Sequence, residues 1–154
     1  MLKINDKIPN FEILTDKGEF KVSKHLGKKI VTFFFPRADT SGCTAETIAF
    51  TNLQKKFEHL NCIVIGISKD NINKQGKFRE KYNLTCELGA DFENNVCEQF
   101  GVWVEKSMYG RKYMGIQRAT FLCDEKGIIT NVWEKVKVPG HADEVLAAVE
   151  KINK

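Results

Sequence analysis

Residues 29–46 read KIVTFFFPRADTSGCTAE, and this stretch decides the fold class. Its first part, Ile30 to Phe35, is an almost unbroken run of β-branched and aromatic residues, which is typical of a strand buried on both faces of a sheet. Pro36 ends the run, and a polar loop follows. From about Thr40 the apolar residues recur at helical spacing, so the stretch predicts a buried strand, a loop and a helix in succession.

The segments on either side of this stretch complete a mixed α/β pattern. The helix is predicted to run to about Leu60, with Ala49, Leu53 and Phe57 sharing its apolar face. A second buried strand follows, and two buried strands joined by a helix predict a right-handed parallel crossover. The remaining predicted elements are strands at 11–14, 20–22, 62–67, 86–88, 119–123 and 128–133, and helices at 71–82, at 93–100 and from about His141 to the C-terminus.

These elements predict a single α/β domain spanning residues 1–154. The first two strands flank the turn signal Asp16-Lys17-Gly18 and form an N-terminal β-hairpin. The two strands nearest the C-terminus form a second hairpin. The expected architecture is a thioredoxin-like fold, in which a central mixed β-sheet is flanked by helices on both faces.

Composition and charge exclude several classes of function. Hydrophobic residues make up 42% and charged residues 29% of the chain, as in an ordinary soluble domain. The net charge of +4 comes without a run of Lys and Arg interleaved with aromatics, so we expect no nucleic-acid partner. No apolar run has membrane-spanning length, and the first residues lack a signal-peptide pattern. A cytoplasmic protein with no membrane partner is expected.

The five cysteines favour free or redox-active thiols over a disulfide scaffold. Their number is odd, no CxxC is present, and a reducing compartment disfavours structural disulfides. The histidines are scattered and no Cys/His set has zinc-finger spacing, so no metal is expected. The histidines are His25, His59 and His141, and the cysteines are Cys43, Cys62, Cys86, Cys97 and Cys123.

Cys43 differs from the other cysteines in its position at the start of a helix. If Thr40 is the N-cap, Cys43 occupies the third helical position, among free backbone N–H groups and at the positive end of the helix dipole. That environment favours the thiolate, which is the nucleophilic form. The Thr40 hydroxyl lies one turn before the sulfur and is a candidate donor to a substrate oxygen. The residue types suit attack of a thiolate on an O–O bond.

The spacing Pro36-x-x-x-Thr40-x-x-Cys43 matches the PxxxTxxC motif of the peroxiredoxin family. Residues 103–122, including Arg118, and the segment Pro139-Gly140-His141-Ala142 are similar to the peroxiredoxin Q branch, also called bacterioferritin comigratory protein. The resemblance covers essentially the whole chain.

The resemblance implies a role for each site residue. Cys43 would be the peroxidatic cysteine, Thr40 would orient the peroxide, and Pro36 would shield the thiolate. Arg118 would stabilise the thiolate and the transition state, which agrees with the permanent charge and several donors of a guanidinium. Glu46 would support the arginine. No metal, haem or flavin cofactor is implied.

Simpler interpretations of the same residues remain open. The four other cysteines suit small buried hydrophobes. Thr40 could be only a helix cap, and Arg118 could be a solvated charge at a strand end. Two positions also depart from the family pattern. Ile48 stands where a resolving cysteine is common, and Ser41 stands where proline is common; the next helix has no cysteine either.

The sequence therefore predicts a thiol-dependent peroxidase for hydrogen peroxide and alkyl hydroperoxides, working as a monomer or weak dimer. The missing resolving cysteine favours a one-cysteine cycle, with an external thiol such as thioredoxin or glutaredoxin as reductant. Unconventional internal partners stay open, in the order Cys86, Cys97 and then Cys62 or Cys123. The rival hypotheses are a thiol–disulfide oxidoreductase, which the absent CxxC disfavours, and a non-catalytic redox sensor.

Overall fold

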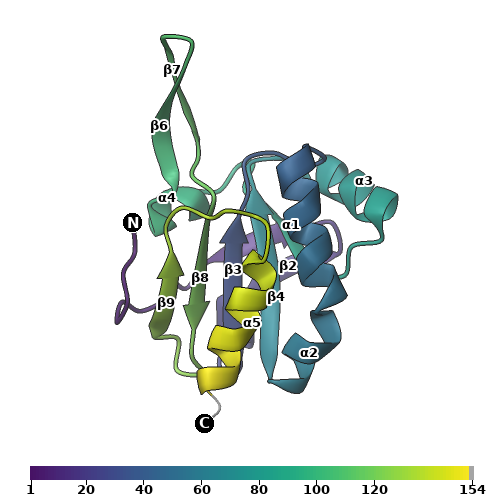
Figure 1. Cartoon of the computed structure of the whole chain (residues 1–154), viewed down its shortest axis with the longest axis vertical. Helices are drawn as coiled ribbons and strands as arrows, with labels where there is room; N and C mark the ends of the chain where they lie inside the picture. The colour runs from purple at the N-terminus through teal and green to yellow at the C-terminus, as the bar shows by residue number, and fades with distance from the viewer. Residues whose placement is uncertain (153–154) are drawn as a thin grey trace.

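A seven-stranded mixed sheet forms the centre of the molecule (Figure 1). The structure is a computed structural model that describes residues 1–152. Strand β3 (Lys29–Phe34) pairs in parallel with β4 (Cys62–Ser68) on one side and antiparallel with β8 (Ala119–Cys123) on the other. All six residues of β3 are buried. The prediction of a buried inner strand followed by a parallel crossover partner is confirmed.

The other strands extend the sheet in both directions, in the order β2-β1-β5-β4-β3-β8-β9. The N-terminal hairpin and the hairpin near the C-terminus, both predicted, lie at its two edges. Their strands and the remaining inner strand are β1 (Glu12–Thr15), β2 (Gly18–Lys21), β5 (Glu87–Ala90) and β9 (Ile129–Trp133).

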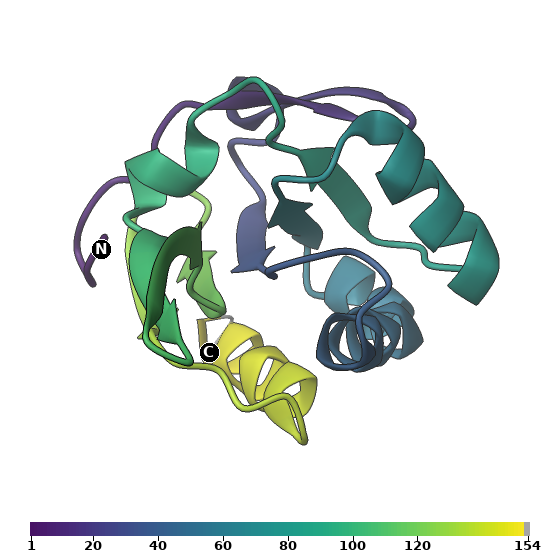
Figure 2. The ribbon, with the colours of Figure 1, turned by 90° about the horizontal axis from the view of Figure 1, so that it is seen from above.

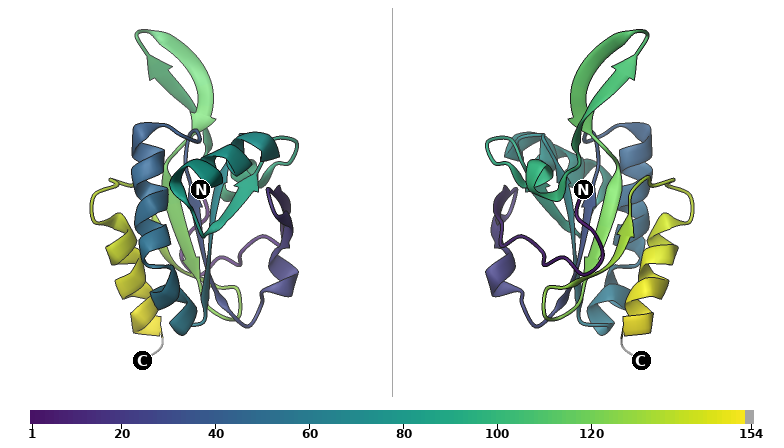
Figure 3. Two further views of the ribbon diagram at one scale, coloured as in Figure 1. Left: turned by 90° about the vertical axis from the view of Figure 1, so that its right-hand side faces the viewer. Right: turned by 90° about the vertical axis from the view of Figure 1, so that its left-hand side faces the viewer.

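Helices cover both faces of the sheet, as the thioredoxin-like prediction requires. Seen from above, α1, α2 and α5 stand together on one side, and α4 lies on the opposite side (Figure 2). Helix α3 packs beside β5 and β1. The side views of Figure 3 show the same separation of α1, α2 and α5 from the N-terminal hairpin. The helices are η1 (Val22–Lys24), α1 (Ser41–Asn52), α2 (Gln54–His59), α3 (Ile72–Tyr82), α4 (Val96–Phe100) and α5 (His141–Ile152).

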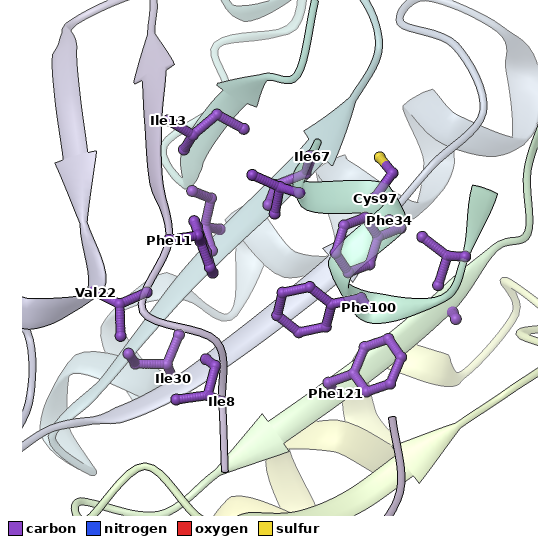
Figure 4. Packing of buried hydrophobic residues seen from close by; sticks show 14 of the residues in the cluster. Ile8, Phe11, Ile13, Val22, Ile30, Phe34, Ile67, Cys97, Phe100 and Phe121 are labelled. Carbon is purple, nitrogen blue, oxygen red and sulfur yellow. The ribbon is translucent and has the colours of Figure 1, made fainter. Parts of the chain in front are cut away.

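Two apolar cores, one on each face of the sheet, follow from side-chain alternation along β3. Ile30 and Phe34 belong to the core beneath α4, shown in Figure 4, where Phe100 and Phe121 pack around Phe34. Val31 and Phe33 point to the other face. There they join the core beneath α1 and α5, which also contains Cys43. Helix α1 therefore rests on the second core.

The predicted helix from Thr40 to Leu60 is wrong in one respect, because it is two helices. The chain breaks at Leu53, whose φ and ψ are −101° and 6°, between α1 and α2. Thr51 and Asn52 are weak helix formers and precede the break. Within α1, Cys43 and Phe50 are fully buried, whereas the expected Ala49 is only partly buried. The predicted apolar face of the long helix is therefore only partly correct.

Two smaller boundaries also differ from the prediction. Helix α4 begins at Val96 rather than at residue 93, because the buried Asp91 carboxylate accepts hydrogen bonds from the N–H groups of Val96 and Cys97 and fixes that start. The preceding strand runs over 87–90 rather than 86–88.

A second, two-stranded sheet was not predicted at all. Strands β6 (Trp103–Met108) and β7 (Arg111–Ile116) form a hairpin that projects from the upper end of the molecule (Figure 1). Its two-residue turn has positive φ at both Tyr109 and Gly110, the geometry of a type I′ turn. Tyr-Gly is an unusual pair for that turn, so the sequence lacked the common Asn-Gly signal.

Candidate active site

Cys43 lies in the first turn of α1, at the end of the sheet where β3 finishes. Thr40 is the N-cap residue, and the first helical hydrogen bond runs from the Thr44 N–H to the Thr40 carbonyl, 2.9 Å apart. Cys43 is thus the third helical residue, as predicted. The helix itself does not use the N–H groups of its first turn, which surround the sulfur with partial positive charge. The Cys43 residue is fully buried.

Arg118 reaches Cys43 because of the strand register. Ala119, the first residue of β8, pairs with Phe34, the last residue of β3. Arg118 therefore lies at the same end of the sheet as the C-terminal end of β3, from which the chain continues through the loop of residues 36–40 to Cys43. Its Nη2 lies 3.3 Å from Cys43 Sγ, and its Nη1 donates to Glu46 Oε1 at 2.6 Å. The structure brings Cys43, Glu46 and Arg118 together.

The missing side chain at Gly42 makes room for this guanidinium. A Cβ atom at position 42 would lie 3.2 Å from Arg118 Nη2, tighter than ordinary van der Waals contact. Any larger residue at position 42 would crowd Arg118 Nη2, which is the atom that contacts Cys43 Sγ. Gly42 is a site residue that the prediction omitted, although a glycine directly before a helix-start cysteine is a usable signal.

Burial controls the charge of Glu46. Its side chain is 1% exposed and Oε2 has no hydrogen-bond partner among the described residues. Burial raises the pKa of Glu46 to about 7, and the charge and hydrogen bond of Arg118 only partly oppose this rise. The carboxyl group is therefore poised to change its charge near neutral pH, which alters how strongly Arg118 is neutralised.

His141, the first residue of α5, is buried, and its ring is held neutral. Its Nε2 and the Thr120 Oγ1 are 2.8 Å apart, and its ring packs edge-on against Phe50 and Trp133. Burial, and then the charge of Arg118, lower the pKa of His141 to about 4. A neutral ring adds no further positive charge to that of Arg118. The sequence prediction gave this histidine no role.

The loop before the helix is held by α3. Asp39 has φ of 64°, and its carboxylate accepts hydrogen bonds from Lys81 Nζ at 2.9 Å and Tyr82 Oη at 2.5 Å. Both Pro36 and Thr40 in this loop are exposed. The Thr40 hydroxyl donates to the Arg37 carbonyl at 2.8 Å instead of capping α1. The contacts of Asp39 thus anchor the loop of residues 36–40 to α3, while Pro36 and Thr40 at the two ends of this loop are exposed to solvent.

Comparison with known proteins identifies the family. The AhpC/TSA family profile matches residues 4–132, more than half of the chain. The chain belongs to the AhpC/TSA family of peroxiredoxins. It is 40% identical to the peroxiredoxin Bcp of Bacillus subtilis (strain 168) over 153 residues, which cover 99% of this chain and 98% of that protein. The predicted family is therefore confirmed, and this peroxiredoxin is a thiol-dependent peroxidase.

Solved structures agree with the peroxiredoxin fold over the whole chain. The bacterioferritin comigratory protein of Xanthomonas campestris, whose structures address its alkyl peroxide reduction activity, has a TM-score of 0.92 and 32% identity, covering 99% of this chain and 100% of that one. A cysteine-to-serine variant of the PrxQ of Xylella fastidiosa has a TM-score of 0.94 and 31% identity, covering 100% and 99%. The thioredoxin-like prediction is confirmed.

No helix within residues 1–152 has the length and apolar character needed to cross a membrane. In the same part of the chain, no three or more His, Cys, Asp or Glu side chains are grouped so that they could hold a metal ion.

The other four cysteines of this peroxiredoxin are buried and lie apart from Cys43. Cys62 pairs with Lys29 and Cys123 with Ile30, at the start of β3, so both lie at the opposite end of the sheet. Cys97 belongs to the core on the other face. Cys86 shares the core of Cys43. Burial raises the pKa of all four thiols, to about 12 for Cys62, Cys86 and Cys123.

We expect Glu46→Gln to change how the stability of this peroxiredoxin depends on pH. Because the folded protein raises the pKa of Glu46 above its ordinary 4.5, its contribution to stability is full below pH 4.5 and is lost as the pH rises through about 7. A shift of this size corresponds to at most about 3 kcal/mol. Free energies of unfolding, measured from pH 4.5 to 8, should fall more in the parent than in the variant. Parallel curves would contradict the prediction.

Proposed function

We propose that this peroxiredoxin reduces hydrogen peroxide and alkyl hydroperoxides, with the Cys43 thiolate as the attacking group. The observation that carries the proposal is the position of the Arg118 guanidinium, 3.3 Å from Cys43 Sγ and held by Glu46. A permanent cation at this distance stabilises a thiolate over a thiol. The alkyl peroxide reduction described for the Xanthomonas campestris relative supports the wider substrate range.

In the proposed reaction, the Cys43 sulfur attacks one oxygen of the peroxide. An S–O bond forms as the O–O bond breaks, and the electron pair of the O–O bond leaves with the second oxygen, which takes a proton from water. The sulfur becomes a sulfenic acid and the peroxide becomes water or an alcohol. Arg118 stabilises negative charge while it moves from the sulfur to the departing oxygen.

Thr40 and Pro36 are proposed to act when the loop of residues 36–40 closes over a bound peroxide. Thr40 would turn its hydroxyl from the Arg37 carbonyl toward the substrate, and Pro36 would move from solvent to cover the thiolate. Their present exposure, beside a fully buried Cys43, supports a loop that must shift to admit substrate.

A one-cysteine cycle is proposed for the return step. Cys86 and Cys62 share the core of Cys43, but Cys62 lies at the opposite end of the sheet. Cys86 lies next to Thr85, whose N–H donates to Thr51 near the far end of α1. Eight helical residues from Cys43 to Thr51 span about 12 Å, beyond the roughly 7 Å that a disulfide allows between Cα atoms. A disulfide would need substantial unfolding. An external thiol, such as that of thioredoxin or glutaredoxin, is the proposed reductant.

The compartment and the assembly are part of the same proposal. We propose that the enzyme is cytoplasmic and acts as a monomer or weak dimer. Its five free thiols agree with a reducing compartment, which also supplies the thiol reductant.

An assay of peroxide consumption tests the proposed reaction, with hydrogen peroxide or cumene hydroperoxide as oxidant and dithiothreitol as reductant. Stoichiometric loss of peroxide is expected, and peroxide consumption no faster than with dithiothreitol alone would refute it.

We expect peroxide to leave a sulfenic acid on Cys43 and no internal disulfide. Dilute protein is treated with one equivalent of peroxide and a dimedone-type trap, without thiol, and its peptides are mapped by mass spectrometry. The trap should appear on Cys43 alone, because burial raises the pKa of the other four thiols, whereas the Arg118 guanidinium lies 3.3 Å from the Cys43 sulfur. Cys86→Ser and Cys97→Ser serve as controls and should turn over like the parent with dithiothreitol. A stoichiometric disulfide from Cys43 to another cysteine would contradict the one-cysteine cycle.

A further inference from the structure

The loop of residues 36–40 is held at Ala38 as well as at Asp39. Ala38 is half-buried and packs against the core that contains Cys43, whereas the other four residues of the loop are exposed. The Ala38 N–H donates to Asp70 Oδ2 at 2.7 Å. A hydrogen bond from a backbone N–H to a carboxylate is charge-assisted, and it is therefore stronger than a bond between neutral groups. Asp70 thus fixes the one loop residue that packs against the core.

The two segments meet because β3 and β4 are parallel and end side by side. Beyond the last residue of β3, the Phe35 N–H still donates to the Ile67 carbonyl of β4, at 3.0 Å. The segments that leave these strands, residues 36–40 and 69–71, therefore begin at the same end of the sheet. Asp70 lies in the second segment and contacts the first across 32 positions of sequence.

A buried network fixes the position of the Asp70 carboxylate. Ser68 Oγ donates to Asp70 Oδ2 at 2.7 Å and accepts from Gln75 Nε2 at 3.1 Å. Gln75 Nε2 also donates to the Gly89 carbonyl on β5, at 2.8 Å. The Ser68 and Gln75 side chains are fully buried. Because β4, α3 and β5 together hold this network, the carboxylate is a rigid point to which the loop is tied.

The space beside the contact with Asp70 is open. A cavity of about 470 Å³ is bordered by the loop of residues 36–40, by Asp70 and by α3. Close packing does not hold this side of the loop, so directional contacts hold it. The contacts of Asp39 with Lys81 and Tyr82 are exposed to solvent, where ion pairs contribute little. The partly buried hydrogen bond to Asp70 is therefore the stronger of the two anchors.

We infer that Asp70 is a positioning residue of the peroxidase site, which fixes Ala38 as the pivot of the loop that closes over the peroxide. The inference rests on Cys43 being the attacking group. Peroxide attack needs the loop to close in one geometry, so loss of the pivot lowers the rate of attack. Ionisation of the thiol is not affected, because Arg118 stays 3.3 Å from the sulfur.

Two reactions of Cys43 separate the position of the loop from the ionisation of the thiol. Stopped flow gives the second-order rate with hydrogen peroxide, which needs the closed loop. Alkylation by uncharged iodoacetamide, followed against pH by peptide mass spectrometry, needs only an accessible thiolate. Asp70→Ala removes the acceptor, and Asp70→Asn keeps an oxygen that can accept the Ala38 N–H. Asn71→Ala is the control for lost stability, because the Asn71 side chain caps α3 by accepting the Lys74 N–H at 2.9 Å.

We expect Asp70→Ala to react with peroxide about tenfold to a hundredfold more slowly than the parent. Its alkylation at high pH should be about threefold faster or more, because the loosened loop uncovers the buried sulfur, and the pH midpoint of alkylation should not move. Asp70→Asn should recover the peroxide rate to within about threefold, since a neutral oxygen still accepts the bond. Asn71→Ala should lower the thermal unfolding midpoint by about 2 to 4 °C and leave both reactions of Cys43 unchanged.

A parental peroxide rate in Asp70→Ala would overturn the inference, as would a shifted alkylation midpoint, an equal loss in Asn71→Ala or no recovery in Asp70→Asn. Thermal unfolding verifies that each variant is folded. If Asp70→Ala does not fold, Ser68→Ala takes its place, because it removes the hydroxyl that orients the carboxylate. It should change both rates in the same directions by smaller factors, and parental rates would overturn the inference. Alkylation uses no peroxide, so these outcomes are separate from the Cys43→Ser test of the proposed function.

Discussion

Replacing Cys43 by serine should abolish peroxide reduction, with a loss of at least about a thousandfold in kcat/KM. A serine hydroxyl does not ionise at neutral pH, so the nucleophile is lost even though its position is kept. The fold should survive, because the hydroxyl is smaller than the thiol and can accept the hydrogen bond that Arg118 Nη2 directs at Cys43 Sγ. Peroxide consumption with dithiothreitol, together with the thermal unfolding midpoint, measures both effects.

The matched control for this substitution is Cys62→Ser. Cys62 is also buried, but it lies at the opposite end of the sheet, where β4 starts beside Lys29. The Cys62→Ser variant should lose some stability and keep its peroxidase activity. Near-parental activity in Cys43→Ser would remove Cys43 from the mechanism, and inactivity in both variants would point to a folding defect.

Replacing Arg118 by alanine should slow peroxide attack by about tenfold to a hundredfold. The change removes a charge-assisted hydrogen bond to the sulfur, and such bonds contribute about 1.5 to 3 kcal/mol. The thiolate should also form at a higher pH than in the parent, because a neighbouring cation is lost. Stopped-flow measurement of the second-order rate with peroxide, and ultraviolet absorbance of the thiolate against pH, test the two effects.

Removing Arg118 also leaves the buried Glu46 without its ion-pair partner, so the Arg118→Ala variant is expected to lose stability as well as rate. The double variant Arg118→Ala with Glu46→Gln removes that unpaired carboxylate and should regain stability without regaining the rate. Arg111→Ala, an exposed arginine on β7, is the control for a general change in charge. An unchanged rate and an unchanged thiolate titration in Arg118→Ala would show that the arginine does not act on the sulfur.

Local patterns in the chain were sufficient to predict most of the secondary structure. The run Ile30 to Phe35 is so uniformly β-branched and aromatic that only a buried strand suits it, and Pro36 and Thr40 mark where the strand stops and the helix starts. The position of Cys43 in the first helical turn follows from those boundaries alone. The break at Leu53 and the hairpin turn at Tyr109 were missed, because neither carries a strong local signal.

The sequence by itself therefore determined the family, the position of Cys43 in the first turn of a helix and the order of most of the elements, since each depends on residues close together in the chain. Only the tertiary structure decided what surrounds the sulfur. Arg118 lies 75 residues from Cys43 and reaches it because β8 pairs with β3 in one register. The pKa of Glu46 depends on which distant segments exclude water from its carboxyl group, and spacing along the chain does not encode that exclusion.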